Sequence, residues 1–352
     1  MTVLYIIVGI LIFGLLIGIH EFGHFSAAKL CDVRVDEFAI GMGPAIFKKQ
    51  KGETLYSIRC IPFGGYCAMA GEDEASDDPR AFINKNPLQK FVILVAGSFN
   101  NFVLGVLIVI ILYSNAAGFR APIIEAFMDG CPYQGEDALM VGDRIYKVDG
   151  KRIYEYYDVS DFLADGREYH DLVVIRDGKK VKLDNFYFVP VEYEGQTSKM
   201  YGFYFGIEEA TFATKISNAW DTSMEFSRLV WMSLGELFKG NVSVDEFSGP
   251  VGIVDMMAET GEQAESVADG LYEIFYLGAF IAINLAIMNM LPIPAVDGGR
   301  VFLLIVTVII EKLTKKKLDP KYEAYIHTAG MILLLAFMAY IMFNDIVKIV
   351  VK

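Results

Sequence analysis

Four long apolar stretches dominate the pattern of hydrophobic and polar positions along the chain. They cover residues 3–28, 91–113, 271–296 and 324–346. A helix of about 20 apolar residues crosses the roughly 30 Å hydrocarbon core of a bilayer, so each stretch predicts a transmembrane helix. A fifth apolar run, residues 301–310, is too short to cross alone, and it either continues a broken third span or lies at the membrane interface.

The segments between these spans carry their own periodicities. In residues 54–61 apolar and polar positions alternate, which predicts a strand, and Gly64-Gly65 follows it. Residues 121–209 hold short apolar runs separated by Asp-Gly turns, which predicts a small β-rich domain. Residues 212–238 have apolar positions at helical spacing. An amphipathic helix at the membrane interface and a helix packed against the β-rich domain both fit this last pattern.

The composition agrees with membrane spans joined to a soluble module. Hydrophobic residues make up 54% of the 352 residues, yet 21% are charged, which spanning helices alone would not tolerate. The formal net charge of −13 comes mainly from residues 118–270, so nucleic acid is not an expected partner. The four cysteines show no Cys-x-x-Cys spacing and are expected to be unpaired thiols: Cys31, Cys60, Cys67 and Cys131.

The distribution of Lys and Arg predicts how the spans cross the membrane, because short cytoplasmic loops are enriched in both. We expect the segment between the first two spans and the segment between the last two on the cytoplasmic side, with both termini and the β-rich domain outside. Lys348 and Lys352 oppose this orientation. The first span lacks a basic amino-terminal region and a cleavage site, so it is expected to stay attached. The basic residues behind the orientation are Lys29, Arg34, Lys48, Lys49, Lys51, Arg59, Arg80, Lys85 and Lys90, then Lys312, Lys315, Lys316, Lys317 and Lys321.

The first span ends in the sequence His20-Glu21-Phe22-Gly23-His24. Histidines four residues apart lie on one helix face and can bind one zinc ion, with the glutamate as base for the metal-bound water. Polar groups inside hydrocarbon cost free energy and are usually functional, so chemistry explains the motif better than accident. A hydrolytic zinc takes three protein ligands and keeps a place for water. The third ligand must come from elsewhere, because Leu30 occupies the place of a third histidine in the longer motif.

Asp297 is the candidate third ligand. It follows Asn289-Met290-Leu291-Pro292-Ile293-Pro294-Ala295-Val296 and precedes Gly298-Gly299. An acid at the edge of the hydrocarbon needs a cation or a metal, and the two prolines interrupt the helix so that the carboxylate can turn toward the histidines. The alternative is that Asp297 caps the next helix, a role that Asp fills readily.

Together these motifs resemble those of the site-2 protease family of intramembrane zinc metalloproteases, of the bacterial regulator-of-sigma-factor protease type. The resemblance implies that His20, His24 and Asp297 hold zinc and that Glu21 acts as general base and acid. It also implies that Asn289 helps to hold the substrate or its oxyanion. The resemblance extends over nearly the whole chain and rests on residues 20–24, 38–44, 61–66, 101–102, 248–253 and 289–299.

The function implied by this resemblance is that of a zinc metalloendopeptidase in regulated intramembrane proteolysis. It would hydrolyse peptide bonds within or near the transmembrane segment of single-span substrates, either anti-sigma factors after a first cut or remnant signal peptides. The protein would lie in the plasma membrane, with its active site toward the cytoplasm. The family's membrane-associated β-hairpin would contain the strand at residues 54–61, whose edge could pair with an extended substrate. From the residues alone, an ordinary hairpin without substrate fits as well.

The β-rich domain resembles a single extracytoplasmic PDZ domain. Residues 141–150 resemble the core of that fold, and Tyr204-Phe205-Gly206-Ile207 resembles its carboxylate-binding loop in the permuted order of this family. The usual small-residue stretch before Val141 is replaced by residues 131–137. Capture of a peptide carboxyl terminus and steric filtering of bulky substrates are both open.

The predicted fold class is therefore a polytopic α-helical membrane protein. It has four transmembrane helices, a membrane-associated β-hairpin and an inserted β-rich PDZ-like domain, and its expected partners are transmembrane substrates and the lipid bilayer. The expected segments are the first transmembrane helix with the zinc motif at 1–30, a cytoplasmic-side loop with the hairpin at 31–90, the second helix at 91–115, the PDZ-like domain at 120–210, an amphipathic region at 211–268, the third helix with Asn289 and Asp297 at 270–298, a cytoplasmic-side segment at 299–322, and the fourth helix at 323–347.

Two other classes of protein fit part of the pattern. A transporter also places polar residues and broken helices inside the membrane, but the four spans show no internal repeat. A catalytically inactive membrane scaffold would usually have lost His20, Glu21 or Asp297, and all three are present. The remaining histidines, His170 and His327, are expected to be ordinary polar residues rather than metal ligands.

Overall fold

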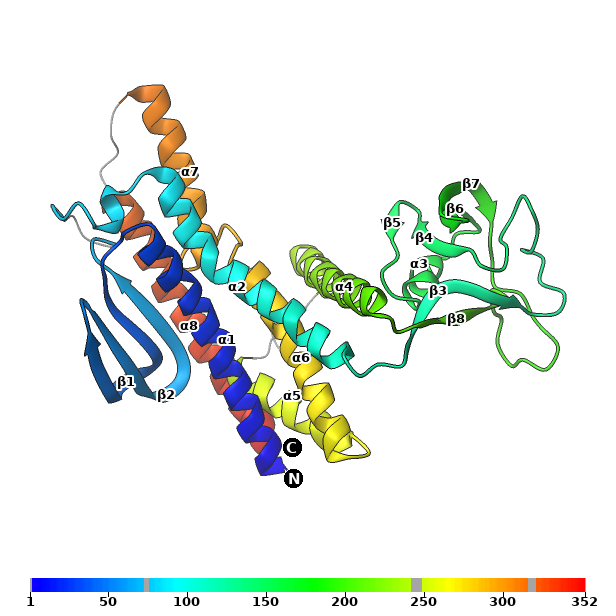
Figure 1. The fold of residues 1–352 in the computed structure, drawn as a ribbon, viewed down its shortest axis with the longest axis horizontal. Helices are drawn as coiled ribbons and strands as arrows, with labels where there is room; N and C mark the ends of the chain where they lie inside the picture. Colours follow the sequence, from blue (N-terminus) through cyan, green and yellow to red (C-terminus); the bar gives the residue numbers. More distant parts are fainter. Residues whose placement is uncertain (1, 73–75, 242–248, 316–320, 352) are drawn as a thin grey trace. The chain divides into compact units, whose positions relative to one another are not determined.

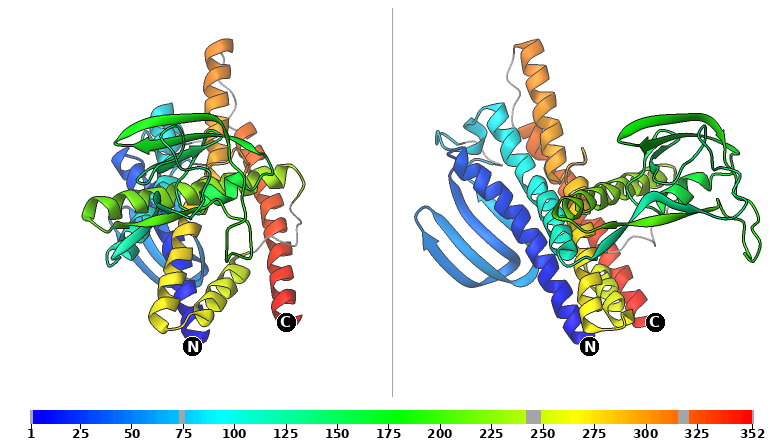
Figure 2. Two further views of the ribbon diagram at one scale, coloured as in Figure 1. Left: turned by 90° about the vertical axis from the view of Figure 1, so that its right-hand side faces the viewer. Right: turned by 45° about the vertical axis from the view of Figure 1, so that its right-hand side comes forward.

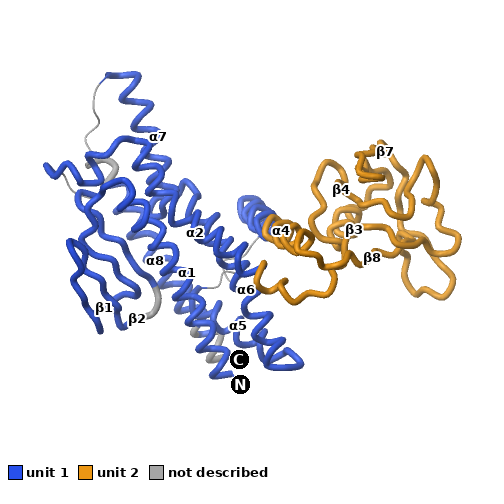
Figure 3. Tube along the Cα trace, viewed as in Figure 1, with its two compact units in different colours: residues 1–109, 226–352 blue, residues 110–225 orange. Residues whose placement is uncertain are grey.

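A computed structural model describes residues 2–72, 76–241, 249–315 and 321–351. The chain divides into two compact units (Figure 3). Unit 1 comprises residues 1–109 and 226–352, and unit 2 comprises residues 110–225. Each unit has its own hydrophobic core.

Unit 1 is mainly helical, and among its described residues four helices are long and apolar enough to cross a membrane. They are α1 (Thr2–Leu30), α2 (Pro87–Tyr113), α6 (Val267–Met288) and residues 325–345 within α8 (Lys321–Val351). The start of α1 and the end of α8 lie at the same end of the unit (Figures 1 and 2). Four spans with an inserted β domain confirm the predicted fold class, and the chain is a multi-pass membrane protein.

Shorter helices complete unit 1. They are α5 (Pro250–Gln263), α7 (Asp297–Thr314) and the carboxyl-terminal half of α4 (Phe212–Phe238), whose bounds are those predicted from the helical spacing. α5 packs between α1 and α6, where Leu16, Met257 and Ile274 are fully buried. This core holds the first and third spans together near the beginning of α1.

The third span ends earlier than the sequence predicts. α6 stops at Met288, and residues 289–296 form a turn before α7 begins. Pro292 and Pro294 cannot donate backbone hydrogen bonds to a continuing helix, although the apolar run itself extends to Val296. The run at 301–310 lies within α7, which is a helix of its own after this break.

β1 (Val35–Lys51) and β2 (Thr54–Met69) form an antiparallel hairpin beside α1 (Figure 1), and the hairpin folds back on itself. Phe38 in β1 pairs with Cys67 on one side and with Tyr56 on the other. Both strands bend at glycines with positive φ, Gly41 at +86° and Gly64 at +88°, a conformation that side chains with a Cβ rarely adopt. The hairpin is therefore a sheet of four segments, in the order 47–51, 54–58, 35–40 and 65–69.

Two details of the hairpin differ from the sequence prediction. Residues 54–61 are in a strand, as predicted, but β2 continues to Met69, so Gly64 and Gly65 lie within it. Residues 54–58 have a paired segment on each side, whereas the free edges belong to residues 47–51 and 65–69. This segment therefore has no open edge for another chain.

Unit 2 is built on an antiparallel sheet with strand order β7-β6-β4-β3-β8. The two Asp-Gly turns predicted from the sequence connect β4 to β5 and β6 to β7, and both residues of each turn have positive φ. Ile124, Leu139, Ile145, Leu172 and Phe188 are fully buried in its core. The elements are β3 (Gly118–Phe127), β4 (Arg144–Val148), β5 (Lys151–Arg152), α3 (Asp158–Leu163), β6 (Tyr169–Arg176), β7 (Lys179–Tyr187) and β8 (Phe203–Glu209).

Candidate metal centre

α1 places His20 and His24 one helical turn apart, close to α2. Both side chains are buried, and their Nε2 atoms are 3.2 Å apart. His24 Nδ1 lies 2.8 Å from the carbonyl oxygen of Ile93. A carbonyl oxygen can only accept, so Nδ1 carries the proton and Nε2 keeps its lone pair. The Ile93 carbonyl thus fixes His24 in the tautomer that a metal ligand needs.

The side chain of Asn101 in α2 faces His20 Nδ1, as the carbonyl of Ile93 faces His24 Nδ1. Its amide nitrogen lies 3.4 Å from His20 Nδ1, while its Oδ1 is buried without a hydrogen-bond donor. Turning the amide by 180° exchanges the two atoms in the same space, and His20 Nδ1 then donates to Oδ1. This arrangement satisfies the buried oxygen and leaves the lone pair on His20 Nε2, as for His24.

The break after α6 brings Asp297 to the two histidines. Its Oδ2 lies 3.1 Å from His20 Nε2 and 3.2 Å from His24 Nε2. The amide of Gly298 donates to the carbonyl oxygen of Asn289 at 2.7 Å, which closes the turn. Val296, not Asp297, is the N-cap residue of α7, so the capping alternative for Asp297 is wrong.

The three facing atoms form a triangle with sides of 3.1 to 3.2 Å. Ligand atoms about 2.0 to 2.1 Å from a tetrahedral zinc lie roughly 3.3 Å apart, so the triangle has the size of three ligands with a fourth position open. Asp297 Oδ2 is buried and meets no hydrogen-bond donor in the described part of the chain. Converging lone pairs in an apolar span are unfavourable unless a cation lies among them, so the residues present fit a metal ion.

Comparisons with known proteins agree with this geometry. Residues 8–337 match the model of Peptidase family M50. The chain belongs to Peptidase family M50. It is 35% identical to a protein of Clostridium acetobutylicum named as a candidate zinc metalloprotease, over 97% of each chain. It is also 33% identical to a similarly named protein of Clostridium perfringens, over 98% of this chain and 99% of that one. The zinc metalloprotease RasP of Bacillus licheniformis is 27% identical over 98% of this chain and 99% of its own.

Glu21 and Asn289 of this M50 peptidase lie on the elements that carry the triangle. Glu21 is partly exposed beside the hairpin, where a Cβ on Gly65 would be 3.1 Å from Glu21 Cγ. It interacts electrostatically with His20, His24 and Asp297. Asn289 is the C-cap residue of α6, and its backbone holds the turn before Asp297. In the described structure the Asn289 side chain has no hydrogen bond.

Gly97 is a further residue of the site that the sequence did not single out. A Cβ at Gly97 would collide with His24 Nε2 and lie 2.8 Å from His20 Cε1. Gly97, Asn101 and Gly105 are four residues apart, so one face of α2 approaches its neighbours closely. That spacing in an apolar helix was the available signal, but it also suits ordinary helix packing.

A second group of possible metal ligands lies in unit 2: Asp149, Asp165 and His170. The Arg167 guanidinium already bonds Asp149 Oδ2 at 2.7 Å and Asp165 Oδ2 at 2.6 Å. His170 is buried, with Nδ1 2.8 Å from Asp149 Oδ2. The carboxylate oxygens of this group already accept hydrogen bonds, so His170 stands among residues that bond to one another rather than to a metal.

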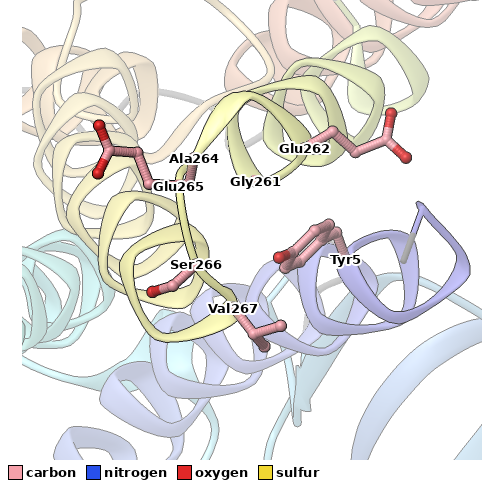
Figure 4. Close-up of a pocket in the computed structure, with 7 residues that line it drawn as sticks. All are labelled: Tyr5, Gly261, Glu262, Ala264, Glu265, Ser266 and Val267. Carbon is pink, nitrogen blue, oxygen red and sulfur yellow. The ribbon is translucent and has the colours of Figure 1, made fainter.

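The M50 peptidase also has a cavity of about 370 Å³ at the beginning of α1 (Figure 4). It is lined by Tyr5 of α1 and by residues at the junction of α5 and α6: Gly261, Glu262, Ala264, Glu265, Ser266 and Val267. Tyr5 precedes His20 by fifteen residues, or about 22 Å along a helix. This cavity is therefore remote from the metal centre.

Proposed function

We propose that this M50 peptidase is an intramembrane zinc metalloendopeptidase. It cleaves single-span membrane proteins within or near their transmembrane segment, with anti-sigma factors after a first cut and remnant signal peptides as the candidate substrates. The observation that carries the proposal is the triangle of His20, His24 and Asp297 at the end of an apolar span. Zinc is the metal because two imidazoles and a carboxylate suit it and because the relatives are named zinc metalloproteases.

His20 and His24 would hold the ion through their Nε2 atoms, and Asp297 through Oδ2. When bound, zinc acidifies a coordinated water and polarises the scissile carbonyl. Glu21 accepts a proton from the attacking water on its carboxylate and later donates it to the leaving amide nitrogen. Asn289 would orient the substrate or stabilise its oxyanion.

The substrate must be extended before it is cut, because a helix conceals its carbonyl groups in internal hydrogen bonds. The strand predicted to receive it covers residues 54–61. Residues 54–58 are already paired on both sides within the hairpin, so no other chain can pair with them. We assign this role to the free edge at residues 65–69, which runs beside Glu21. Backbone pairing there would present a peptide bond to the metal centre.

Proline substitution tests this edge, because proline removes a backbone donor. We expect Ala68→Pro to slow cleavage at least tenfold with zinc still bound. The matched control is Lys49→Pro on the opposite free edge of the same sheet, which should leave cleavage within about twofold. Equal rates for Ala68→Pro and Lys49→Pro, at full zinc content, reject substrate pairing at 65–69.

Unit 2 would control which substrates arrive. β8 contains the predicted carboxylate-binding residues, and in the sheet order it is an edge strand, so a peptide could pair beside it. Peptide capture and steric filtering predict different results for a chain lacking residues 118–209. A filter predicts that untrimmed, full-length substrates become cleavable. Capture predicts that cleavage of trimmed substrates becomes weaker.

The orientation follows from the basic residues between the spans. We propose that the carboxyl-terminal end of α1 faces the cytoplasm and that unit 2 is extracytoplasmic in the plasma membrane. A cysteine at exposed Glu194 should react with a membrane-impermeant maleimide in intact cells, whereas one at exposed Lys315 should react only after lysis. The opposite pattern reverses the orientation.

The decisive test uses the purified full-length chain in detergent with a single-span peptide. The wild type should contain one zinc ion and cleave the peptide, whereas Glu21→Gln should keep the zinc and lose cleavage. Glu265→Gln, an exposed glutamate at the far cavity, is the matched control and should cleave normally. Cleavage that persists in Glu21→Gln contradicts the proposed mechanism. An inactive scaffold predicts no cleavage by any of the three.

A further inference from the structure

The turn that delivers Asp297 contains a backbone conformation that costs energy. Ala295, two residues before Asp297, has φ of +86°. For a residue with a Cβ, positive φ costs of order 1 kcal/mol or more relative to the common backbone conformations. Such a residue keeps this conformation only when contacts with its surroundings hold it there. The question is which groups hold Ala295.

α8 supplies two contacts to this turn. The backbone N–H of Ala295 points at His327 Nδ1 at 3.3 Å. One turn further along α8, Gly330 lies so close to Pro294 that a Cβ on Gly330 would collide with the proline ring and lie 2.9 Å from its carbonyl carbon. The fourth span is therefore in direct contact with the two residues at the sharpest part of the turn.

His327 is in turn connected to the hairpin. Arg300, in the first turn of α7, directs its Nε at His327 Nε2 at 3.2 Å and pairs its guanidinium with the Glu72 carboxylate. Glu72 Oε2 also accepts from the amide of Met69, at the end of β2, at 3.4 Å. A continuous set of contacts thus joins the free edge at 65–69 to the turn before Asp297.

We propose that His327 is a positioning residue that accepts from the Ala295 N–H, holds Ala295 in its strained conformation and so aligns Asp297. The proposal rests on the proposed metalloprotease function and goes beyond the expectation that His327 is an ordinary polar residue rather than a metal ligand. Outer groups of this kind typically change metal affinity or activity 10- to 100-fold when they are removed. Their effect is on the geometry of Asp297, so metal affinity and kcat should fall together while KM changes little.

Two substitutions separate the two ring nitrogens. His327→Asn puts an oxygen acceptor near the place of Nδ1, which faces Ala295, and His327→Gln puts one near the place of Nε2, which faces Arg300. A neutral imidazole accepts through one nitrogen at a time, so the native ring serves Ala295 in only one of its tautomers. The proposal predicts that Asn preserves function better than Gln, although both are amides.

The test measures zinc affinity by competition with a chelating dye, and kcat and KM with a single-span peptide, on the full-length chain in detergent. We expect His327→Gln to weaken zinc binding and lower kcat about tenfold each, with KM within about twofold. His327→Asn should stay within about threefold of wild type. The visible absorption of the cobalt-substituted protein should shift in His327→Gln, because Asp297 is displaced.

Rescue distinguishes alignment of the turn from general packing. Glycine adopts positive φ without strain, so adding Ala295→Gly to His327→Gln should restore most of the zinc affinity and of kcat. The control is His170→Gln, at a buried histidine of unit 2, which should leave zinc affinity unchanged. If Gln and Asn behave alike, or if Ala295→Gly restores nothing, the proposal is overturned. Absence of zinc and cleavage in the wild type would instead overturn the proposed function itself.

Discussion

Two groups of His and Asp side chains in this molecule have similar composition and similar spacing. His20, His24 and Asp297 meet in unit 1, and Asp149, Asp165 and His170 meet in unit 2. In unit 2, Arg167 places a permanent cation between the carboxylates. In unit 1, the carbonyl of Ile93 and the amide of Asn101 fix the imidazoles so that their lone pairs face one carboxylate oxygen.

The difference shows that ligand types and distances do not by themselves make a metal site. It also matters whether neighbouring groups already donate hydrogen bonds to the acceptor atoms of the cluster, because such acceptors no longer need a metal ion. The surroundings add to this, since an uncompensated carboxylate is far more costly at an apolar span than in a partly hydrated turn. The following predictions test this contrast.

The largest effect is expected from removing a ligand on the unit 1 side. His24→Ala should abolish zinc binding and lower cleavage about a thousandfold or more, because two ligands do not hold the ion in place. The comparison is His170→Ala, which should destabilise unit 2 but leave one zinc per chain. Zinc content by elemental analysis checks both, and loss of zinc in His170→Ala would show that the wrong cluster has been assigned.

Crowding the unit 1 cluster should have the next largest effect. Gly97→Ala puts a methyl group against both imidazoles and should weaken zinc binding by roughly 10- to 100-fold through displaced ligands. Gly235→Ala is the control, since a Cβ there meets nothing within 4 Å in α4, a helix of the same length of 27 residues. Zinc titration measures both variants. Normal affinity in Gly97→Ala would mean that α2 moves freely away from α1.

Removing the cation of unit 2 should make its cluster resemble that of unit 1. Arg167→Ala leaves Asp149 and Asp165 without their shared donor, which should destabilise unit 2 only slightly because the guanidinium is exposed. Millimolar zinc should then protect unit 2 from hydrogen exchange in Arg167→Ala and have no such effect in the wild type. Zinc protection that is equal in the two proteins would contradict the role given to Arg167.

The smallest effect concerns pH. Burial alone would raise the pKa of Asp149, but hydrogen bonds from His170 and from the amide of Asp171 outweigh it and hold the pKa below its usual value. Because the folded pKa lies below the unfolded one of about 3.9, the stabilisation is complete above pH 4 and is lost as pH falls through the folded value.

Hydrogen exchange of unit 2, corrected for its intrinsic pH dependence, measures this loss. Asp149→Asn should destabilise unit 2 by about 1 kcal/mol near pH 6, and the difference from wild type should shrink below pH 4. A difference between the two proteins that does not change with pH would show that the Asp149 charge contributes nothing.

The membrane spans followed from the apolar pattern, but one end of the third span did not. Leu291, Ile293 and Val296 extend the apolar run past Met288, so hydropathy placed the end of the span at Val296. The two prolines predicted an interruption, but not that the helix ends as early as Met288. The fold-back of the hairpin was equally hidden, because Phe38 pairs in two directions with residues that are far apart in sequence. Bends at Gly41 and Gly64 become necessary only once that pairing exists.

For the candidate metal centre, the sequence predicted the three side chains that the structure brings together, His20, His24 and Asp297. His20, Glu21 and His24 follow from helical spacing, and Asp297 from its position in an apolar context. Asn101 was singled out only as part of the resemblance at residues 101–102, without a role, and Gly97 was not singled out, since four-residue spacing in an apolar helix is also ordinary packing. The role inferred for His327 depends on a backbone angle at Ala295, which no sequence pattern reports.

X-ray absorption at the zinc edge of the purified wild-type chain tests the central claim most directly. Two imidazoles, one carboxylate and a water should give only nitrogen and oxygen neighbours at about 2.0 to 2.1 Å, with outer-shell scattering from two histidine rings. A sulfur neighbour at about 2.3 Å, or scattering from fewer than two histidines, would contradict the assignment of His20, His24 and Asp297.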